Sequence, residues 1–118
     1  MAGLPKPLFW MGSSLKDLRG FPEEVQDVMG FALHQAQMGE KSPASKPMRG
    51  MGGGVLEVVD DFDGDTYRAV YTVRFGQAVY VLHAFQKKSK RGIATPKPDV
   101  DVIKKRLDAA AWHHKDQA

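Results

Sequence analysis

The chain has 118 residues, of which 42% are hydrophobic and 26% charged, and it contains no cysteine. This composition is typical of one globular domain, and the length excludes two full domains. Without cysteine, a disulfide framework, a thiolate zinc site and a cysteine nucleophile are excluded. No apolar run reaches the ~20 residues that a membrane helix needs, and the start lacks a signal-peptide core. We therefore expect one domain over residues 1–118, located in the cytoplasm and without contact to a membrane.

The net charge of +3 is unevenly distributed along the chain. Residues 87–106 hold eight basic and two acidic residues, a net of +6, so the remainder carries −3. The basic residues are Lys87, Lys88, Lys90, Arg91, Lys97, Lys104, Lys105 and Arg106. Clustered cations beside an acidic body favour a partner that carries phosphates or an acidic protein surface, and a solvated basic face is the alternative.

The first elements are predicted to be a strand and a short helix. Prolines at two of the first seven positions disfavour a helix there, and the apolar run at residues 8–11 predicts a buried strand. Ser13 or Ser14 can cap a short helix that runs to Leu18 and is closed by Gly20.

The clearest helix begins at Pro22, which is predicted to occupy its first position, and it ends before Gly39. Glu23 and Glu24 lie in its positively polarised first turn. Its apolar residues recur at helical spacing and predict one face packed on a core. They are Val25, Val28, Met29, Ala32, Leu33 and Ala36.

Residues 41–54 contain four Gly, two Pro and two Ser without periodicity, and predict an exposed loop that carries Arg49. Three strands are predicted after it, at residues 55–59, 66–75 and 78–86. The dipeptides between them, Asp63-Gly64 and Gly76-Gln77, are plausible two-residue hairpin turns. We assign the aspartates around the first turn to a hairpin tip rather than to a calcium loop, because the glycine spacing is wrong.

A last helix is predicted at about residues 99–111, with residues 112–118 as a frayed tail. In this helix Val100, Ile103 and Leu107 are spaced to pack, whereas Lys104, Lys105 and Arg106 point mostly elsewhere. The fold class is then α+β: a twisted antiparallel sheet of about four strands, with two N-terminal helices on one face and a C-terminal helix. We expect the other face of the sheet to be free for function.

Strand pairing identifies the residues on that free face. With two-residue turns, Arg68 lies opposite Phe85 and Val59, and Val70 lies opposite His83 and Glu57. Glu57, Arg68, His83, Phe85 and Lys87 then share one face. The opposite face is almost wholly apolar, with Tyr67, Ala69, Tyr71, Val73, Phe75, Tyr80, Leu82 and Ala84.

An exposed aromatic ring between Arg, His and Lys is typical of a nucleic-acid surface, because the ring can stack on a base while the cations hold phosphates. Simpler interpretations stay open for each residue. Arg68 can form a surface ion pair with Glu57, Phe85 can lie under a loop, and a lone strand histidine such as His83 is often merely tolerated.

Residues 65–107 resemble the RelE/ParE toxin superfamily, and specifically its HigB-like, phage-derived branch. The resemblance rests on the pair Tyr67-Arg68, on the run LHAFQKKSK at residues 82–90, and on Thr95-Pro96 followed by a closing helix. It implies a RelE-like fold and a ribosome-dependent mRNA endonuclease that uses no metal or other cofactor. It also implies a cognate antitoxin, often a helix-turn-helix protein, with the ribosome and mRNA as further partners.

The resemblance also implies roles for individual residues. Arg68 corresponds to the strand arginine that grips the scissile phosphate, and Lys87, Lys88 and Lys90 to basic residues after the last strand. His83 is the candidate for proton transfer, Glu57 can orient it or act as the base, and Phe85 stacks on a nucleotide. The ribosome-binding residues are then Arg49, Phe85, Lys88, Lys90, Arg91, Lys104, Lys105 and Arg106.

The sequence departs from the family pattern at one point, and two competing functions remain open. Several relatives have a catalytic tyrosine near the C-terminus, whereas no tyrosine follows Tyr80 here, and His113 or His114 can replace it only if the tail is ordered. ParE-like members of the superfamily instead bind DNA gyrase without nuclease chemistry. A phage-derived binding protein that keeps only the fold is a third alternative.

Overall fold

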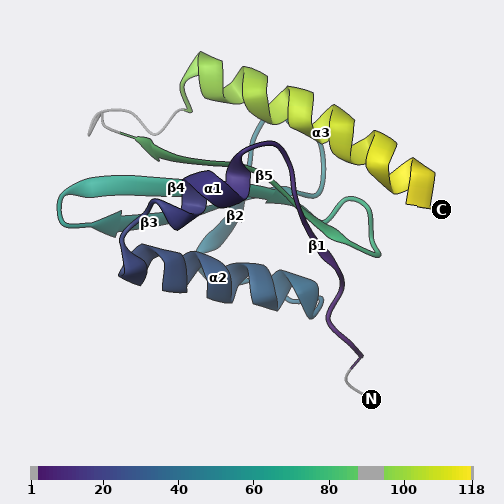
Figure 1. Ribbon diagram of the computed structural model, residues 1–118, viewed down its shortest axis with the longest axis horizontal. Coiled ribbons are helices and arrows are strands. Elements are labelled where there is room, and N and C mark those ends of the chain that lie inside the picture. Colours follow the sequence, from purple (N-terminus) through teal and green to yellow (C-terminus); the bar gives the residue numbers. More distant parts are fainter. Residues whose placement is uncertain (1–2, 88–94, 118) are drawn as a thin grey trace.

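The computed structural model describes residues 3–87 and 95–117 (Figure 1). The elements are β1 (Leu8–Trp10), α1 (Ser14–Arg19), α2 (Glu23–Gln37), β2 (Ser45–Pro47), β3 (Val55–Phe62), β4 (Asp65–Thr72), β5 (Val79–Lys87) and α3 (Lys97–Gln117). The five strands form one sheet in the order β1-β5-β4-β3-β2. The predicted α+β class is therefore confirmed, with five strands instead of about four.

The sheet is antiparallel except at one edge, where β1 runs parallel to β5. The predicted first strand exists, but it is only half-buried because it has a neighbour on one side alone. Parallel pairing to the last strand needs a long connection, and here the chain between β1 and β5 contains α1, α2 and the other three strands.

Most residues of the segment 41–54 are exposed, as predicted, but the segment is not only a loop, because it contains the strand β2. The side chain of Ser45 is buried and accepts a hydrogen bond of 2.8 Å from the hydroxyl of Tyr71. Burial raises the pKa of Tyr71, while this hydrogen bond acts in the opposite direction. Met48 and Met51 are also buried, so this segment is tied to the sheet by contacts that its own sequence pattern does not reveal.

Helices cover both faces of the sheet, so the expectation of a free face is wrong (Figure 1). On one face, α1 and α2 pack on a core that includes Val58, Ala69 and Val81. On the other face, α3 buries Ile103, Leu107 and Ala110 against residues such as Val70 and Leu82. The result is three layers, with the sheet between two helical layers.

Helix α2 has the predicted bounds and buries most of its predicted stripe. Val28 is the exception, because it lies toward solvent with 36% of its surface exposed. Among the described residues, no helix is both long enough and apolar enough to cross a bilayer.

The β3–β4 hairpin turns at Asp63-Gly64 in the predicted register, with Phe62 opposite Asp65 and Val59 opposite Arg68. Both turn residues have positive φ, +51° at Asp63 and +84° at Gly64. This is the backbone of a type I′ turn, which suits the twist of the flanking strands. The Asp-Gly turn assignment and the hairpin tip are therefore confirmed.

We expect Gly64→Ala to lower the free energy of unfolding by about 1–2 kcal/mol, because an alanine Cβ is strained at positive φ. The matched control is Gly30→Ala, at an exposed position in α2 where an added Cβ meets nothing within 4 Å. That substitution should stabilise the protein by about 0.5–1 kcal/mol, since alanine is the better helix former. Chemical denaturation of both variants measures the difference, and equal shifts would contradict the turn assignment.

The β4–β5 connection differs from the predicted two-residue hairpin. The amide of Ala78 does donate to the carbonyl of Phe75, at 2.9 Å, so the chain turns at Gly76-Gln77. The strand ladder, however, starts farther away, with Thr72 opposite Tyr80. The register shifts between Tyr71 and Val70. On the far side of this shift the strands have the predicted pairs, Val70 with His83 and Arg68 with Phe85.

This irregularity is a bulge in β5 at Leu82, and it changes which side chains share a face. Phe75, Tyr80 and Leu82 were predicted on the core side with Ala84, but they lie in the core under α3. The remaining predicted core residues, including Tyr67 and Tyr71, face α1 and α2 as expected.

Helix α3 extends to Gln117, so the prediction of a frayed tail is wrong. The Nδ1 atom of His113 lies 2.8 Å from the Tyr80 hydroxyl, and the ring of His114 stacks on Phe75 with centroids 5.1 Å apart. Burial raises the pKa of Tyr80. These aromatic contacts at the end of the sheet hold the last turns of the helix in place.

Candidate functional site

A groove of about 780 Å³ opens between the end of β2, the centre of β3 and the start of α3. Its described lining residues are Lys46, Pro47, Met48, Arg49, Glu57, Thr95 and Val100. Most of this lining comes from the segment that was predicted to be a loop. The groove therefore combines two cationic side chains with one carboxylate on an otherwise largely apolar wall.

Glu57 is the centre of a charge cluster at this groove. The Nη1 atom of Arg68 lies 3.4 Å from both of its carboxylate oxygens, and the Nζ atom of Lys46 lies 3.5 Å from one of them. Glu57 and Arg68 are buried, whereas the side chain of Lys46 is 58% exposed. Among the described residues, the Nε atom of Arg68 is buried without a hydrogen-bond partner.

The residues predicted to share one face do share it, but they are buried instead of exposed. The exposed fractions are 6% for Glu57, 4% for Arg68, 9% for His83, 9% for Phe85 and 7% for Lys87. The prediction failed on exposure because α3 packs over this face, which strand pairing alone cannot reveal. The ion pair between Arg68 and Glu57, one of the simpler interpretations, is present.

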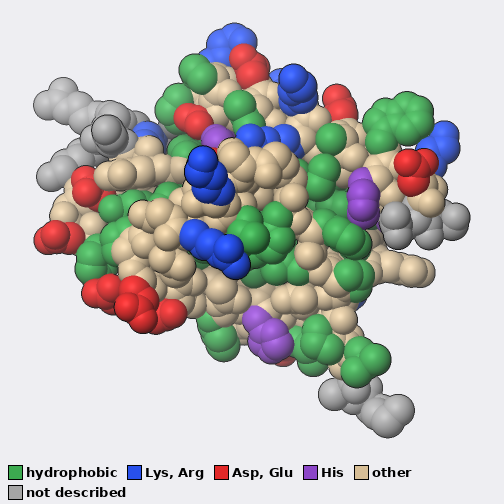
Figure 2. All heavy atoms as spheres, in the orientation of Figure 1, with side chains coloured by type: hydrophobic (Ala, Val, Ile, Leu, Met, Phe, Trp, Pro, Cys, Tyr) green, Lys and Arg blue, Asp and Glu red, His purple; other side chains and the backbone are tan. Residues whose placement is uncertain are grey.

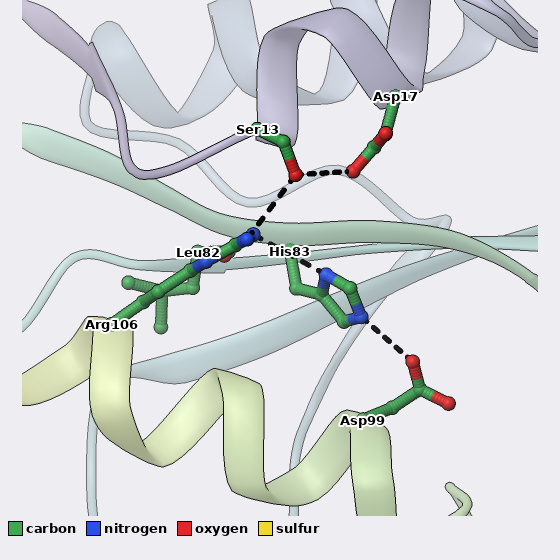
Figure 3. A network of polar contacts seen from close by, with 6 residues as sticks. All are labelled: Ser13, Asp17, Leu82, His83, Asp99 and Arg106. Carbon is green, nitrogen blue, oxygen red and sulfur yellow. Dashed lines mark hydrogen bonds and ion pairs between the residues drawn. The ribbon is translucent and has the colours of Figure 1, made fainter.

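His83 is held on both ring nitrogens by residues of α3 (Figure 3). Its Nε2 atom lies 2.7 Å from a carboxylate oxygen of Asp99, and its Nδ1 atom lies 3.4 Å from the guanidinium of Arg106. Asp99 is therefore the carboxylate in contact with His83, whereas the ion-pair partners of Glu57 among the described residues are Arg68 and Lys46. Sequence reasoning missed Asp99, although it stands at the start of a helix beside the basic segment.

Phe85 stacks on the imidazole of His83, with ring centroids 4.8 Å apart and planes at 20°. Since it is buried, the expectation of an exposed ring that receives a nucleotide is wrong for the described structure. Its position instead fixes the plane of the His83 ring.

The predicted ribosome-binding cations fall into three groups. Arg49, Lys104 and Lys105 are exposed, the first on the groove wall and the others on α3. Arg106 faces the sheet and does not point to solvent, which corrects the expectation from helical spacing. Lys88, Lys90 and Arg91 lie outside the described residues.

One group of acidic side chains lies away from α3, although α3 itself carries Asp99, Asp101, Asp108 and Asp116. Figure 2 shows acidic side chains gathered at the end where the β3–β4 hairpin and the start of α2 lie. They include Glu23, Glu24, Asp61, Asp63 and Asp65. Among the described residues, no three His, Asp or Glu side chains are grouped closely enough to hold a metal ion.

Lys46 is the groove residue that sequence reasoning did not identify. It lies in β2, directly opposite Glu57 in the register. The available signal was weak, because a Ser-Lys-Pro sequence in a glycine-rich segment has no strand periodicity. Only the pairing of β2 with β3 brings its ammonium group to the carboxylate of Glu57.

Two solved structures have a similar fold. The free form of an E. coli RelE toxin mutant matches with a TM-score of 0.59 and 17% identity, over 90% of this chain and 98% of that chain. A RelBE2 toxin-antitoxin complex of Mycobacterium tuberculosis matches with a TM-score of 0.48 and 17% identity, over 73% of this chain and 95% of that chain. No curated protein matches the sequence.

The first of these structures shows that the RelE-like fold inferred from the sequence motifs is correct. The sequence model for Gp49-like phage-derived proteins (DUF891) matches residues 16–108, which span α1 through most of α3 and include the whole charge cluster. The chain therefore belongs to the Gp49-like family of phage-derived proteins.

Proposed function

We propose that this protein is the toxin of a type II toxin-antitoxin system, of the HigB-like branch, and that it cleaves mRNA on the ribosome without a metal ion. The observation that carries the proposal is the carboxylate of Glu57, held 3.4 Å from Arg68 and 3.5 Å from Lys46 in a groove. A carboxylate beside cations supplies both a proton acceptor and positive charge for a phosphate.

The reaction needs only the RNA's own 2′-OH as nucleophile. The 2′ oxygen attacks the adjacent phosphorus, the bond from phosphorus to the 5′ oxygen breaks, and a 2′,3′-cyclic phosphate forms. Glu57 accepts the proton of the 2′-OH, and His83 donates a proton to the leaving 5′ oxygen. Lys46 and Arg49 stabilise the negative charge that grows on the phosphate oxygens, and Arg68 holds the carboxylate of Glu57 in place.

The groove supports the roles of Glu57, Lys46 and Arg49, which line it. Its volume of about 780 Å³ is within the range of small-ligand sites, and its exposed cations, Lys46 and Arg49, are placed where a phosphate can arrive from solvent. Arg68 lies behind Glu57, so it acts on the site through the carboxylate and from the protein side.

We expect Lys46→Met to lower the cleavage rate by about 10²-fold, since one charge contact to the transition state is lost. Because the side chain is largely exposed, the fold should be unaffected. The measurement uses purified ribosomes that translate a defined message in the presence of EDTA, and it detects the 2′,3′-cyclic end of the product.

Lys41→Met is the matched control, because Lys41 is exposed and does not line the groove. It should cleave at the parental rate. Equal loss in both variants would show that general positive charge, and not the groove, is responsible. Absence of cleavage by the parent, together with inhibition of DNA supercoiling by gyrase, would replace the proposal with the ParE-like function.

We also propose that a cognate antitoxin, a helix-turn-helix protein, neutralises the toxin in the cytoplasm. This part rests on the resemblance of residues 65–107 to the HigB-like branch. The same proposal includes attachment to the ribosome through the exposed Arg49, Lys104 and Lys105, which would bind phosphates of ribosomal RNA. The affinity for the ribosome should then fall as the salt concentration rises.

A further inference from the structure

The bulge in β5 gives Arg106 a backbone partner. A bulge leaves part of the strand ladder unpaired, and its free polar groups need other partners. The Nη1 atom of Arg106 donates to the carbonyl oxygen of Leu82, the bulged residue, at 3.0 Å. Arg106 therefore stabilises the irregular backbone immediately before His83.

The same guanidinium contacts the loop between β1 and α1. Its Nη2 atom donates to the hydroxyl of Ser13 at 3.2 Å, and Ser13 in turn donates to Asp17 at 2.7 Å (Figure 3). Gly12 has φ +55°, and a Cβ there would lie 2.5 Å from the Nε atom of Arg106. Only glycine therefore allows this close approach, and three segments of the chain meet at one side chain.

Arg106 and Asp99 approach His83 from one stripe of α3, since they are seven residues apart, about two turns or 10 Å along the axis. Asp99 lies at Nε2 and Arg106 at Nδ1. An arginine guanidinium is always charged and can only donate, so the Nδ1 atom that faces it must present a lone pair. A carboxylate only accepts, so the proton belongs on Nε2.

We infer that Arg106 is a positioning residue that fixes His83 as the tautomer protonated at Nε2, with its ring turned toward the start of α3. Arg106 acts through His83 and through the bulge, and not by holding RNA. This inference rests on the proposed function for its catalytic consequence: the neutral ring gives the leaving 5′ oxygen its Nε2 proton, and water returns a proton to Nε2, in exchange for the proton that Glu57 has taken from the 2′-OH. The tautomer itself is independent of that function.

The direct test is nitrogen NMR of the protein labelled with ¹⁵N-histidine, at neutral pH. The chain has four histidines, and the spectrum of His83→Gln identifies the His83 signals by their loss. In the parent we expect an unprotonated Nδ1 and a protonated Nε2. In Arg106→Met, Asp99 still holds a proton on Nε2, but the guanidinium no longer keeps Nδ1 unprotonated, so we expect the doubly protonated ring to be populated. Arg19→Met, an exposed arginine on α1, should leave the spectrum unchanged.

The parent spectrum tests the predicted tautomer of His83 even if Arg106→Met fails to fold. A parental His83 protonated at Nδ1 would overturn the inference, and so would an unchanged tautomer in a folded Arg106→Met variant. Arg106→Lys is the conservative variant: its single ammonium keeps the charge without the planar fork, so we expect partial recovery of the parental tautomer.

The kinetic test compares the same variants in the ribosome assay. A positioning role predicts that Arg106→Met lowers kcat by about tenfold or more while KM stays within about twofold, because RNA binding is not affected. Raised KM with unchanged kcat would instead make Arg106 an RNA-binding residue and overturn the inference. If the parent does not cleave RNA at all but its tautomer depends on Arg106, the proposed function fails while the structural role of Arg106 stands.

Discussion

Replacing Arg68 with methionine should lower the free energy of unfolding by about 3 kcal/mol and the melting temperature by roughly 10 °C. The reason is the carboxylate left behind. Glu57 is buried, and without Arg68 its remaining ion-pair partner among the described residues is the largely exposed Lys46. A buried charge that loses its partner costs much more than the pair itself contributes.

A double-mutant cycle separates this cost from the loss of packing. Glu57→Leu alone should destabilise the protein by a similar amount, because it leaves the Arg68 cation buried. The combination of Arg68→Met and Glu57→Leu should recover most of the stability, since an apolar pair of similar volume replaces a buried ion pair. Arg19→Met, at an exposed site, serves as the control and should change stability by less than about 0.5 kcal/mol. Additive losses in the double variant would contradict a buried ion pair.

Replacing His83 with glutamine should lower the cleavage rate by about 10²-fold and leave the melting temperature nearly unchanged. The glutamine amide can donate to Asp99 and its carbonyl can accept from Arg106, so both contacts of the imidazole have substitutes. What glutamine cannot do is transfer a proton near neutral pH. Single-turnover cleavage on ribosomes and thermal denaturation measure the two effects.

The stability measurement is the internal control for this variant, because a large drop in melting temperature would assign His83 a structural role alone. Unchanged cleavage by a folded His83→Gln protein would move the general acid to another residue. Lys87, at the end of β5 and opposite Thr66, is then the next candidate, tested by Lys87→Met.

Local sequence was sufficient wherever neighbouring residues determine the backbone. The Asp63-Gly64 turn was predicted correctly because positive φ favours Asp and Gly over most residues, and the turn then sets the register of β3 and β4. The end of α2 near Gly39 was predicted from the same kind of short-range signal, and its start was predicted to within one residue, since Pro22 is the N-cap and Glu23 the first helical residue.

Predictions from local sequence were wrong where the structure of a segment depends on contacts with another part of the chain. The pairing of β2 with β3 and the hydrogen bond from Tyr71 to Ser45 join residues far apart in the chain, and nothing within 41–54 indicates them. Contacts with Tyr80 and Phe75 hold the last turns of α3. The polar tail is therefore helical, although its sequence alone predicts a frayed end.

The candidate site combines both kinds of information. The alternation of β3, β4 and β5 by itself determined that Glu57, Arg68, His83 and Phe85 share a face, because side chains alternate along a regular strand and His83 and Phe85 follow the Leu82 bulge, where the predicted register holds. Only the tertiary structure decided that α3 covers this face and that Asp99 and Arg106 hold His83. It also decided that Lys46 joins Glu57. Alternation assigns a residue to a side of the sheet, whereas its burial and its partners depend on which distant element packs there.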